Sequence, residues 1–350
     1  MQVRDSTELL DLMLAQATAA PDIYQPTNYW SVYNEGIVPE LYSQGLHDFR
    51  RRRKTVLHKF SANDPSPAPL VDLLRIRYLN NRYTRRLRPW VRLLATANRA
   101  QAYLRGQSML GFARKKSAGS WAKPLDALEA SLVGNPERPI RSKGRAYTPS
   151  ILQYYMDYAY CSQFIDFDSL QLVVELGSGS GKQIEVVKKL HPHICFLVFD
   201  IPPQLYVCEQ YLSAVVPGSV VSFRETRNLN ELPEESRGKI FILGNWQFPI
   251  IQGSNVDLFW NCASFQEMEP HVVANYLTYV NQSCKYVFLS QEMGGKRRAD
   301  KLGERGVLQP TTLDDYLAGL ANLRMVDLRP RWSFEGTRIQ NTFWVRSTEQ

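Results

Sequence analysis

A glycine-rich turn, Glu175-Leu176-Gly177-Ser178-Gly179-Ser180-Gly181, has the residue types best suited to binding a small molecule. It ends the short apolar run 172–176 and precedes a helical pattern over 183–190. Glycines let the backbone turn tightly and approach a ligand closely, and open α/β sheets bind ligands at the carboxyl ends of their strands. Asp200 ends the next apolar run, about 20 residues further on, where a carboxylate can accept hydrogen bonds from both hydroxyls of a ribose. We therefore expect a nucleoside-containing cofactor here; the alternative is a tight strand-to-helix turn with no ligand.

Three classes of cofactor compete for this turn. A phosphate-binding P-loop would need glycine at position 176 and Ser or Thr after the Gly-Lys pair, but Leu176 and Gln183 stand there. A dinucleotide fingerprint, G-x-G-x-x-G, would need glycine at position 182, which is Lys182. The pattern E-x-G-x-G-x-G instead resembles the first motif of class I S-adenosylmethionine-dependent methyltransferases. Asp200 suits NAD equally well, so the spacing of the glycines is what favours S-adenosylmethionine.

Further segments resemble the sugar O-methyltransferase family. They are Gly134-Asn135-Pro136, the glycine-rich turn, Asp200-Ile201-Pro202-Pro203 and, most specifically, Asn261-Cys262-Ala263-Ser264-Phe265-Gln266-Glu267-Met268. The resemblance extends over residues 130–350 and does not cover residues 1–125. It implies a fold that binds S-adenosylmethionine and a carbohydrate hydroxyl as the acceptor of the methyl group.

The segment 261–269 follows the fourth predicted strand, where cofactor and acceptor should meet. A sugar hydroxyl is a poor nucleophile, and a base that takes its proton typically accelerates the reaction about a hundred- to ten-thousandfold. Glu267 is our first candidate for this base, with Gln266 orienting the hydroxyl and His271, one helical turn away, as a further catalytic candidate. The alternatives are that Gln266 and Glu267 only begin the next helix, and that His271 faces solvent.

Other side chains near the predicted strand ends complete the expected site. Trp246 and Gln247, after the third strand, could stack on and hydrogen-bond an adenine, although Trp246 suits a core position equally well. Glu292, just past the fifth strand, is a third candidate for the base, the alternative being an ordinary acidic loop residue, and Asp157 could point into the cleft or lie on a half-buried helix face. We expect no metal site, because no cluster of histidines and carboxylates requires one. The expected cofactor-binding residues are Glu175, Gly177, Ser178, Gly179, Gly181, Asp200, Ile201, Trp246, Gln247 and Asn261.

The first part of the chain has helical patterns. They run over 7–19, from about Pro39 into the basic run Arg50–Lys54, over 70–105 and over 150–165. The stretches 61–69, 106–123 and 134–144 indicate loops. We expect residues 1–165 to form an all-helical N-terminal domain that caps the site and binds the substrate.

The second part of the chain alternates short apolar runs with helices. This alternation predicts an α/β fold with a doubly wound, mostly parallel, Rossmann-like methyltransferase sheet over residues 166–350. The third strand is either 219–223 or 239–243, and we favour the latter because it leads directly into the fourth. The runs 324–328 and 341–345 have no helix between them, so we expect an antiparallel C-terminal strand to close the sheet.

Composition and charge narrow the classes of partner. The chain has 350 residues, of which 44% are hydrophobic and 22% charged, as in a globular protein. Residues 1–170 hold 24 Lys and Arg against 15 Asp and Glu, whereas residues 171–350 hold 18 against 19. The basic part contains no recognised nucleic-acid module, so we expect no nucleic-acid partner. The run Arg50–Lys54 indicates a solvated helix end, the alternative being an anion site suited to a phosphate-linked acceptor.

The cysteines and the hydropathy pattern favour a cytoplasmic protein. Five widely spaced cysteines without a C-x-x-C pair indicate neither a disulfide framework nor a zinc site. No apolar run is long enough for a membrane helix. The resemblance to the sugar O-methyltransferase family implies the function that we predict, S-adenosylmethionine-dependent O-methylation of a sugar or glycosylated metabolite, with S-adenosylhomocysteine as product. The alternatives are O- or N-methylation of a non-sugar natural product, nucleic-acid methylation, and a non-catalytic binding protein with the same fold; a homo-oligomer is left open.

Overall fold

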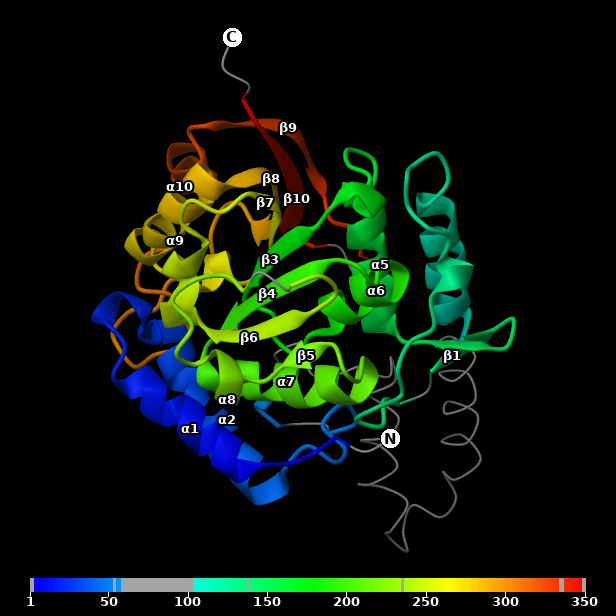
Figure 1. Ribbon diagram of the computed structural model, residues 1–350. Helices are drawn as coiled ribbons and strands as arrows, with labels where there is room; N and C mark the ends of the chain where they lie inside the picture. The colour runs from blue at the N-terminus through cyan, green and yellow to red at the C-terminus, as the bar shows by residue number, and fades with distance from the viewer. Residues whose placement is uncertain are drawn as a thin grey trace, which may run out of the picture.

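An eight-stranded sheet forms the centre of the protein. The computed structural model describes residues 3–52, 55–57, 103–137, 139–233, 236–333 and 337–347. The strand order of the sheet is β5-β6-β4-β3-β7-β8-β10-β9 (Figure 1). All neighbouring pairs are parallel except the two made by β10, which is antiparallel to β8 and β9. The predicted fold class is therefore confirmed. The strands are β3 (Leu172–Leu176), β4 (Cys195–Asp200), β5 (Val220–Val221), β6 (Ile240–Gly244), β7 (Val256–Cys262), β8 (Cys284–Glu292), β9 (Leu323–Pro330) and β10 (Ile339–Arg346).

Helices cover both faces of this sheet (Figure 1). One hydrophobic core contains Val173 together with residues of α5, α6 and α7, and the other contains Val174 together with residues of α9 and α10. Successive strand residues point to opposite faces, so central strands buried on both sides are apolar throughout. The prediction that residues 239–243 form the third strand is confirmed, because β6 pairs with β4 while β5 is a two-residue edge strand. The helices are α5 (Pro149–Cys161), α6 (Lys182–Leu190), α7 (Pro202–Val215), α8 (Phe223–Thr226), α9 (Pro270–Ser283) and α10 (Leu313–Gly319).

Two N-terminal helices, α1 (Thr7–Thr18) and α2 (Asn28–Gln44), pack against α7, as Figure 1 shows. Asp5, just before α1, accepts a hydrogen bond from the Tyr206 hydroxyl of α7. It also accepts one from the backbone N–H of Leu46, 2.8 Å away. The N-terminal segment is thus bonded to the helical layer of the sheet. The division of the chain into domains at residue 165 stays a prediction.

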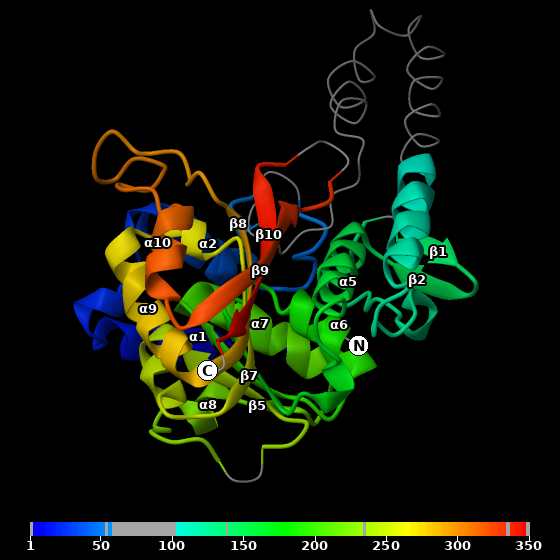
Figure 2. The ribbon, with the colours of Figure 1, turned by 90° about the horizontal axis from the view of Figure 1, so that it is seen from above.

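Several elements of the N-terminal part differ from the sequence-based expectations. The second helix begins at Asn28, not near Pro39, and ends before the basic run. Residues 103–116 are helical where a loop was expected over 106–123, and this helix stands beside α5 in Figures 1 and 2. The predicted loop 134–144 contains the strand β1 (Ile140–Ser142), which forms an antiparallel hairpin with β2 (Arg145–Tyr147). This hairpin corrects the prediction that residues 1–165 are all-helical. Gly106 suits this packing, because a Cβ there would lie 2.9 Å from the Ile140 side chain. The predicted loop 61–69 lies outside the described residues, as does the predicted helix 70–105 up to residue 102.

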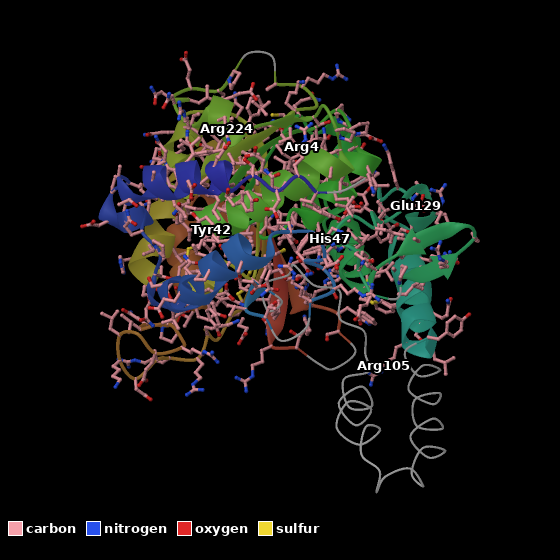
Figure 3. All side chains as sticks on the ribbon, turned by 90° about the horizontal axis from the view of Figure 1, so that it is seen from below. Arg4, Tyr42, His47, Arg105, Glu129 and Arg224 are labelled. Atoms are coloured by element: carbon pink, nitrogen blue, oxygen red, sulfur yellow. The ribbon has the colours of Figure 1, made fainter. Side chains whose placement is uncertain are left out.

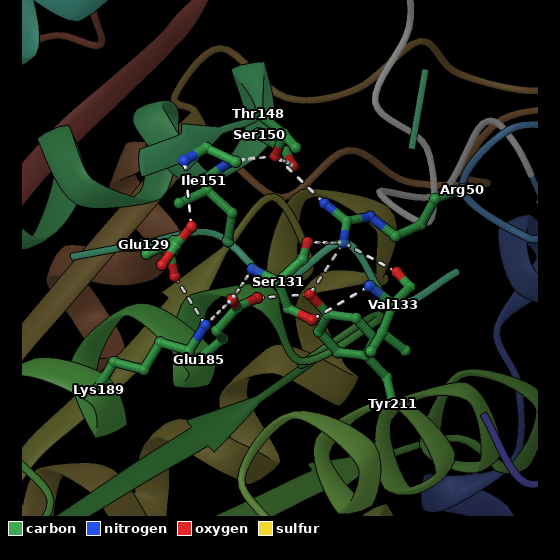
Figure 4. Close-up of polar contacts among 11 residues, drawn as sticks. Arg50, Glu129, Ser131, Val133, Thr148, Ser150, Ile151, Glu185, Lys189 and Tyr211 are labelled. Atoms are coloured by element: carbon green, nitrogen blue, oxygen red, sulfur yellow. Dashed lines mark hydrogen bonds and ion pairs between the residues drawn. The ribbon is translucent and has the colours of Figure 1, made fainter. Parts of the chain in front are cut away.

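Arg50 is buried and α2 ends at Gln44, which corrects the interpretation of the basic run as a solvated helix end, although Arg51 is exposed. The Arg50 guanidinium donates to the carbonyls of Ser131 (2.6 Å) and Val133 (3.0 Å), and to the hydroxyls of Thr148 and Tyr211 (both 3.2 Å) (Figure 4). A guanidinium has five N–H donors in a fixed plane, so one side chain can satisfy several loop acceptors at once. Arg50 therefore ties the loop before β1 to α7, and residues 53 and 54 of the run lie outside the described residues.

Short 3-10 helices connect the main elements. In the described ranges none of the helices is both long enough and apolar enough to cross a membrane. The 3-10 helices are η1 (Asp22–Tyr24), η4 (Leu125–Ala127), η5 (Phe167–Ser169), η6 (Asn245–Ile251) and η7 (Phe265–Glu267).

Candidate active site

A cavity lies at the carboxyl ends of β3, β4 and β7, the edge of the sheet at which the sequence predicted a ligand site. Most of the predicted cofactor residues and the predicted base line it. The predicted residues in its wall are Glu175, Gly177, Ser178, Gly179, Asp200, Ile201 and Glu267. The wall also contains Trp30, Tyr154, Leu176, Gln204, Asn245, Cys262, Ala263, Ser264, Met268 and Arg331.

The glycine-rich turn is closed against the loop that follows β7. Gly177 has a φ of +77°, and a Cβ at this position would lie 2.3 Å from the Oγ atom of Ser264. Ala263 adopts a φ of 58°, a left-handed conformation that costs a non-glycine residue about 1–2 kcal/mol. This strained residue precedes Ser264 and so helps to direct the loop toward the turn. A side chain at position 177 would push the glycine-rich turn away from the loop after β7, and these two segments form the two halves of the cavity wall.

Asp200 binds the turn through its carboxylate. Its Oδ2 atom accepts the backbone N–H of Gly179 (2.8 Å) and lies 3.4 Å from the Oγ of Ser178, and its Oδ1 accepts the N–H of Ile201 (2.8 Å). Burial raises the pKa of Asp200 to about 7, although these hydrogen bonds favour the ionised form. The carboxylate has further lone pairs, and it lies in the cavity wall where ribose hydroxyls can reach it.

Two buried polar groups in the cavity wall have no hydrogen-bond partner among the described residues. They are the Oε2 atom of Glu175 and the side-chain amide of Gln204, and these side chains belong to residues that are 3% exposed. Burial, followed by the neighbouring charge of Asp200, raises the pKa of Glu175 well above its usual value. An unsatisfied buried polar group costs about 1–3 kcal/mol, so both groups are suited to a polar or cationic ligand in the cavity.

Glu267 lies in the cavity wall with a raised pKa. Burial raises it to about 7, whereas Lys296 and a hydrogen bond from Tyr29 act in the opposite direction and the charge of Asp200 raises it slightly. The Nζ atom of Lys296 is 3.5 Å from Oε1 of Glu267. A carboxylate with a pKa near neutrality can hold and release a proton at physiological pH, which is what a general base requires.

The remaining wall combines aromatic side chains with a buried ion pair. Trp30 comes from α2 and Tyr154 from α5, so both aromatic residues belong to the N-terminal part of the chain. Arg331, just after β9, pairs with Asp157 of α5 through two hydrogen bonds, one of them from Nε to Oδ1 over 3.1 Å. Burial acts to lower the pKa of Arg331, but the neighbouring charge of Asp157 more than offsets this and the pKa is raised overall, so the guanidinium stays charged. Asp157 therefore contributes to the cleft through Arg331 and does not line the cavity itself.

Four predicted cofactor residues lie outside the cavity wall. At Gly181 a Cβ would lie 2.8 Å from Leu212, so its small size serves the packing of α6 on α7. Trp246 packs edge-on against Phe223. The Gln247 amide accepts the N–H of Gly244 and donates to the Thr226 carbonyl, which joins β6 to α8, and the adenine contacts of Trp246 and Gln247 stay predictions. Asn261 is fully buried and bonds the Leu176 carbonyl, Phe265 N–H and Gln291.

Two predicted catalytic residues also lie outside the wall. The Oε1 atom of Gln266 accepts the backbone N–H of Glu292 over 2.6 Å, so its amide is directed into the protein and not toward an acceptor hydroxyl. His271 is exposed on the first turn of α9, as the alternative interpretation expected. Glu292 pairs with Lys296 over 3.4 Å and is not in the cavity wall. Glu267 is the one predicted catalytic residue that the fold brings together with the glycine turn.

Sequence reasoning missed several residues of the site. Asn245 directly follows β6, and Gln204 lies in the first turn of the helix after β4, so the strand pattern gave a usable signal for both. Trp30 and Arg331, which line the cavity, and Tyr29 and Lys296, which contact Glu267, gave none, because long-range packing alone brings them to the site. Within the described residues no group of three or more His, Cys, Asp or Glu side chains is arranged to hold a metal ion.

Comparisons with known proteins give only remote likenesses. No protein-family model matches the chain, and no curated protein matches its sequence at a significant level. The mitomycin 7-O-methyltransferase MmcR is 14% identical, with 57% of this chain and 54% of that chain covered and a TM-score of 0.38. Magnesium protoporphyrin IX methyltransferase (ChlM) from Synechocystis PCC 6803 with bound SAM is 11% identical, with 51% and 72% covered and a TM-score of 0.35. An O-methyltransferase family protein from Burkholderia thailandensis is 14% identical, with 56% and 61% covered and a TM-score of 0.36. The chain spans about half the length of MmcR, and likeness at this level does not assign it to a family.

Proposed function

We propose that this protein is an S-adenosylmethionine-dependent O-methyltransferase that acts on a hydroxyl of a sugar or glycosylated metabolite. The observation that carries the proposal is the position of Glu267. A buried carboxylate with a pKa of about 7 lines the same cavity as the glycine-rich turn and Asp200. A nucleoside site and a candidate base thus share one cavity.

The residues of the cavity fit S-adenosylmethionine. The ammonium group of its amino-acid part suits the unpartnered Oε2 atom of Glu175, and its ribose hydroxyls suit the carboxylate of Asp200. The unpartnered amide of Gln204 can bond a further polar atom of the nucleoside. When bound, the cofactor supplies a methyl group on a positively charged sulfur, which a hydroxyl oxygen can attack. The turn at Gly177 and Gly179 leaves the backbone open to close approach.

In this proposal Glu267 takes the proton of the acceptor hydroxyl at a carboxylate oxygen. Its pKa of about 7 leaves a substantial ionised fraction at neutral pH and still makes it a stronger base than an exposed glutamate. The aromatic walls and the buried ion pair orient the acceptor. Well-oriented reacting groups gain about 7–11 kcal/mol over the same groups free in water, so positioning supplies much of the acceleration.

The proposed acceptor is a sugar because of the chemistry around the acceptor side of the cavity. Trp30 and Tyr154 offer apolar ring surfaces, and the pair of Arg331 and Asp157 offers donors and acceptors held in fixed positions. Sugar rings present both C–H faces and hydroxyl groups, and this wall suits both. We further propose that residues 1–165 act as a substrate-binding cap, since Trp30 and Tyr154 belong to them.

A second candidate function is O- or N-methylation of a non-sugar natural product. The two aromatic side chains and Met268 give the cavity an apolar wall that also suits a planar ring system. This wall is the observation that favours it, whereas the polar pair of Arg331 and Asp157 favours the sugar.

The proposal is tested first by calorimetric titration of the purified protein with S-adenosylhomocysteine, NAD and ATP in parallel. We expect micromolar binding of S-adenosylhomocysteine alone, weakened in Asp200→Ala. Binding of NAD or ATP in its place would overturn the cofactor assignment. The acceptor is then sought with S-adenosylmethionine carrying a labelled methyl group and a panel of free sugars, nucleotide-linked sugars, lipid-linked sugars and aromatic natural products. Labelling of aromatic compounds only would favour the second candidate.

A further inference from the structure

The start of α2 holds Glu267 by its main chain and by its side chain. The Oγ1 atom of Thr27 donates to the backbone carbonyl of Glu267 over 3.0 Å. Two residues further on, the Tyr29 hydroxyl hydrogen-bonds the carboxylate of Glu267. These contacts bridge a separation of 240 residues in the sequence. The start of an N-terminal helix therefore fixes a residue of η7, the 3-10 helix that follows β7 of the sheet.

Asn28, which lies between these two residues, anchors the loop that follows β8. Its Nδ2 atom donates to the carbonyls of Glu304 (2.9 Å) and Gly306 (2.8 Å), and its Oδ1 accepts the N–H of Gly303 (2.8 Å). Asn28 is 6% exposed, so these hydrogen bonds are shielded from water. The same loop is bonded to the segment after Glu267, because Thr311 Oγ1 donates to the Met268 carbonyl over 2.8 Å. The loop is thus fixed to α2 and to the site.

This anchored loop carries Lys296. Its Nζ atom lies 3.5 Å from Oε1 of Glu267 and 3.4 Å from Oε1 of Glu292, and 5.9 Å from the centre of the Tyr29 ring. The Lys296 side chain is 23% exposed, so water screens the ion pair only in part. The carboxylate of Glu267 therefore has a hydroxyl donor from α2 and a cation from the loop.

We propose that Tyr29 and Lys296 are positioning residues that hold the Glu267 carboxylate in one orientation and in its ionised form. This inference rests on the proposed function, in which Glu267 is the base. A hydrogen-bond donor or a cation beside a carboxylate favours the ionised form, and two fixed partners restrict its rotamers. The N-terminal helix thereby completes the catalytic centre of the C-terminal sheet.

The charged and titratable groups that act on Glu267 come from four elements. Tyr29 of α2 and Lys296 of the loop favour its ionised form, and the carboxylate of Asp200 at the end of β4 opposes it. Glu292 of β8 shares the ammonium group of Lys296 and so weakens its effect on Glu267. Removing the Tyr29 hydroxyl or the Lys296 ammonium group removes a stabilisation of the ionised form. The pKa of Glu267 should then rise above its value of about 7.

The test compares the pH dependence of kcat/KM in the wild type, Tyr29→Phe and Lys296→Met. If the pKa of Glu267 rises from about 7 to about 8, the ionised fraction at pH 7 falls from about one half to about one tenth. We therefore expect about a fivefold loss at pH 7 that is largely regained above about pH 9, with Lys296→Arg retaining the wild-type profile. Tyr42→Phe is the matched control, because Tyr42 lies on the outside of the same helix and donates to Asp11 (Figure 3). Its pH profile should equal that of the wild type.

A second measurement follows the protonation of Glu267 without any turnover. Infrared difference spectra recorded across a pH titration should contain a carboxylic-acid band that is absent in Glu267→Gln, and its midpoint should move upward in Tyr29→Phe and Lys296→Met. An unmoved midpoint, or an equal loss of kcat/KM at every pH, would overturn the positioning role. If no acceptor is methylated but the midpoint still moves, the positioning contacts stand and the proposed function fails.

Discussion

Replacing Glu267 by glutamine removes the one group in the cavity that we expect to take the acceptor proton. Glutamine has nearly the same size and can still accept hydrogen bonds from Tyr29 and Lys296, but it cannot be protonated at neutral pH. General bases typically contribute about a hundred- to ten-thousandfold to a rate. We therefore expect kcat/KM to fall at least about tenfold, with the residual rate due to alignment of the acceptor.

The pH profile gives this prediction a second, independent part. Glu267 acts as a base only when it is ionised, so wild-type activity should be lost as the pH falls through its pKa of about 7. At about one pH unit below the pKa, about one tenth of the plateau rate should remain, and at two units about one hundredth. The Glu267→Gln enzyme has no such group, so at a saturating concentration of S-adenosylmethionine, which removes the pH dependence expected from Asp200, its remaining activity should not follow this limb.

The assay measures methyl transfer from S-adenosylmethionine between about pH 5 and pH 9, together with calorimetric binding of S-adenosylhomocysteine. Glu269→Gln is the matched control, because Glu269 is also buried but accepts the N–H of Leu308 (3.1 Å) outside the cavity wall. Both variants should bind S-adenosylhomocysteine as the wild type does, and the control should keep its activity. A Glu267→Gln enzyme with the wild-type rate and acid limb would show that another group takes the proton.

Three further predictions concern the cofactor side of the cavity and the fold. Gly177→Ala places a Cβ 2.4 Å from the Cβ of Ser264 at a φ of +77°. This variant should no longer bind S-adenosylhomocysteine in calorimetry, and its free energy of unfolding in urea should fall by at least about 1–2 kcal/mol. Unchanged binding would contradict the close contact. Because the pKa of Asp200 is about 7, wild-type affinity for S-adenosylhomocysteine should fall with decreasing pH below 7, by up to about tenfold per unit, and Asp200→Asn should bind weakly without this dependence. Arg50→Met leaves the half-buried carbonyls of Ser131 and Val133 without this donor and should lower the free energy of unfolding by about 1–3 kcal/mol. An unchanged urea midpoint would show that the network of Figure 4 contributes nothing.

The cofactor side of the site was predictable because its signals are local. The glycines at 177 and 179 follow a strand buried on both faces, and such a strand is a continuous apolar run in the sequence. Asp200 ends the adjacent strand in the same way, and the carboxyl ends of parallel strands meet at one edge. Strand pattern and turn chemistry together therefore placed these residues in one cavity wall.

The direction of side chains in the loops after the strands was not predictable. Gln247 and Gln266 were candidate site residues because each follows the end of a strand. Each side chain is instead hydrogen-bonded to backbone groups of a neighbouring element. Adjacent residues in a tight 3-10 turn point in different directions, so the Gln266 side chain is directed into the protein interior while Glu267 lies in the cavity wall. Only the three-dimensional course of η7 distinguishes the two.

The contribution of α2 to the site could not be predicted from the sequence. This helix acts on the pKa of Glu267 in two opposite ways. Thr27 and Tyr29 pack on Glu267, and this packing helps to exclude the water that would otherwise stabilise its charge. Burial is the largest cause of the raised pKa, while the hydrogen bond from Tyr29 and the ion pair with Lys296 lower it. If α2 only excluded water, a smaller fraction of Glu267 would be ionised at neutral pH and able to accept a proton. If α2 were absent, the carboxylate would be solvated and a weaker base. A pKa near neutrality therefore depends on both effects, and one helix distant in the sequence supplies part of each.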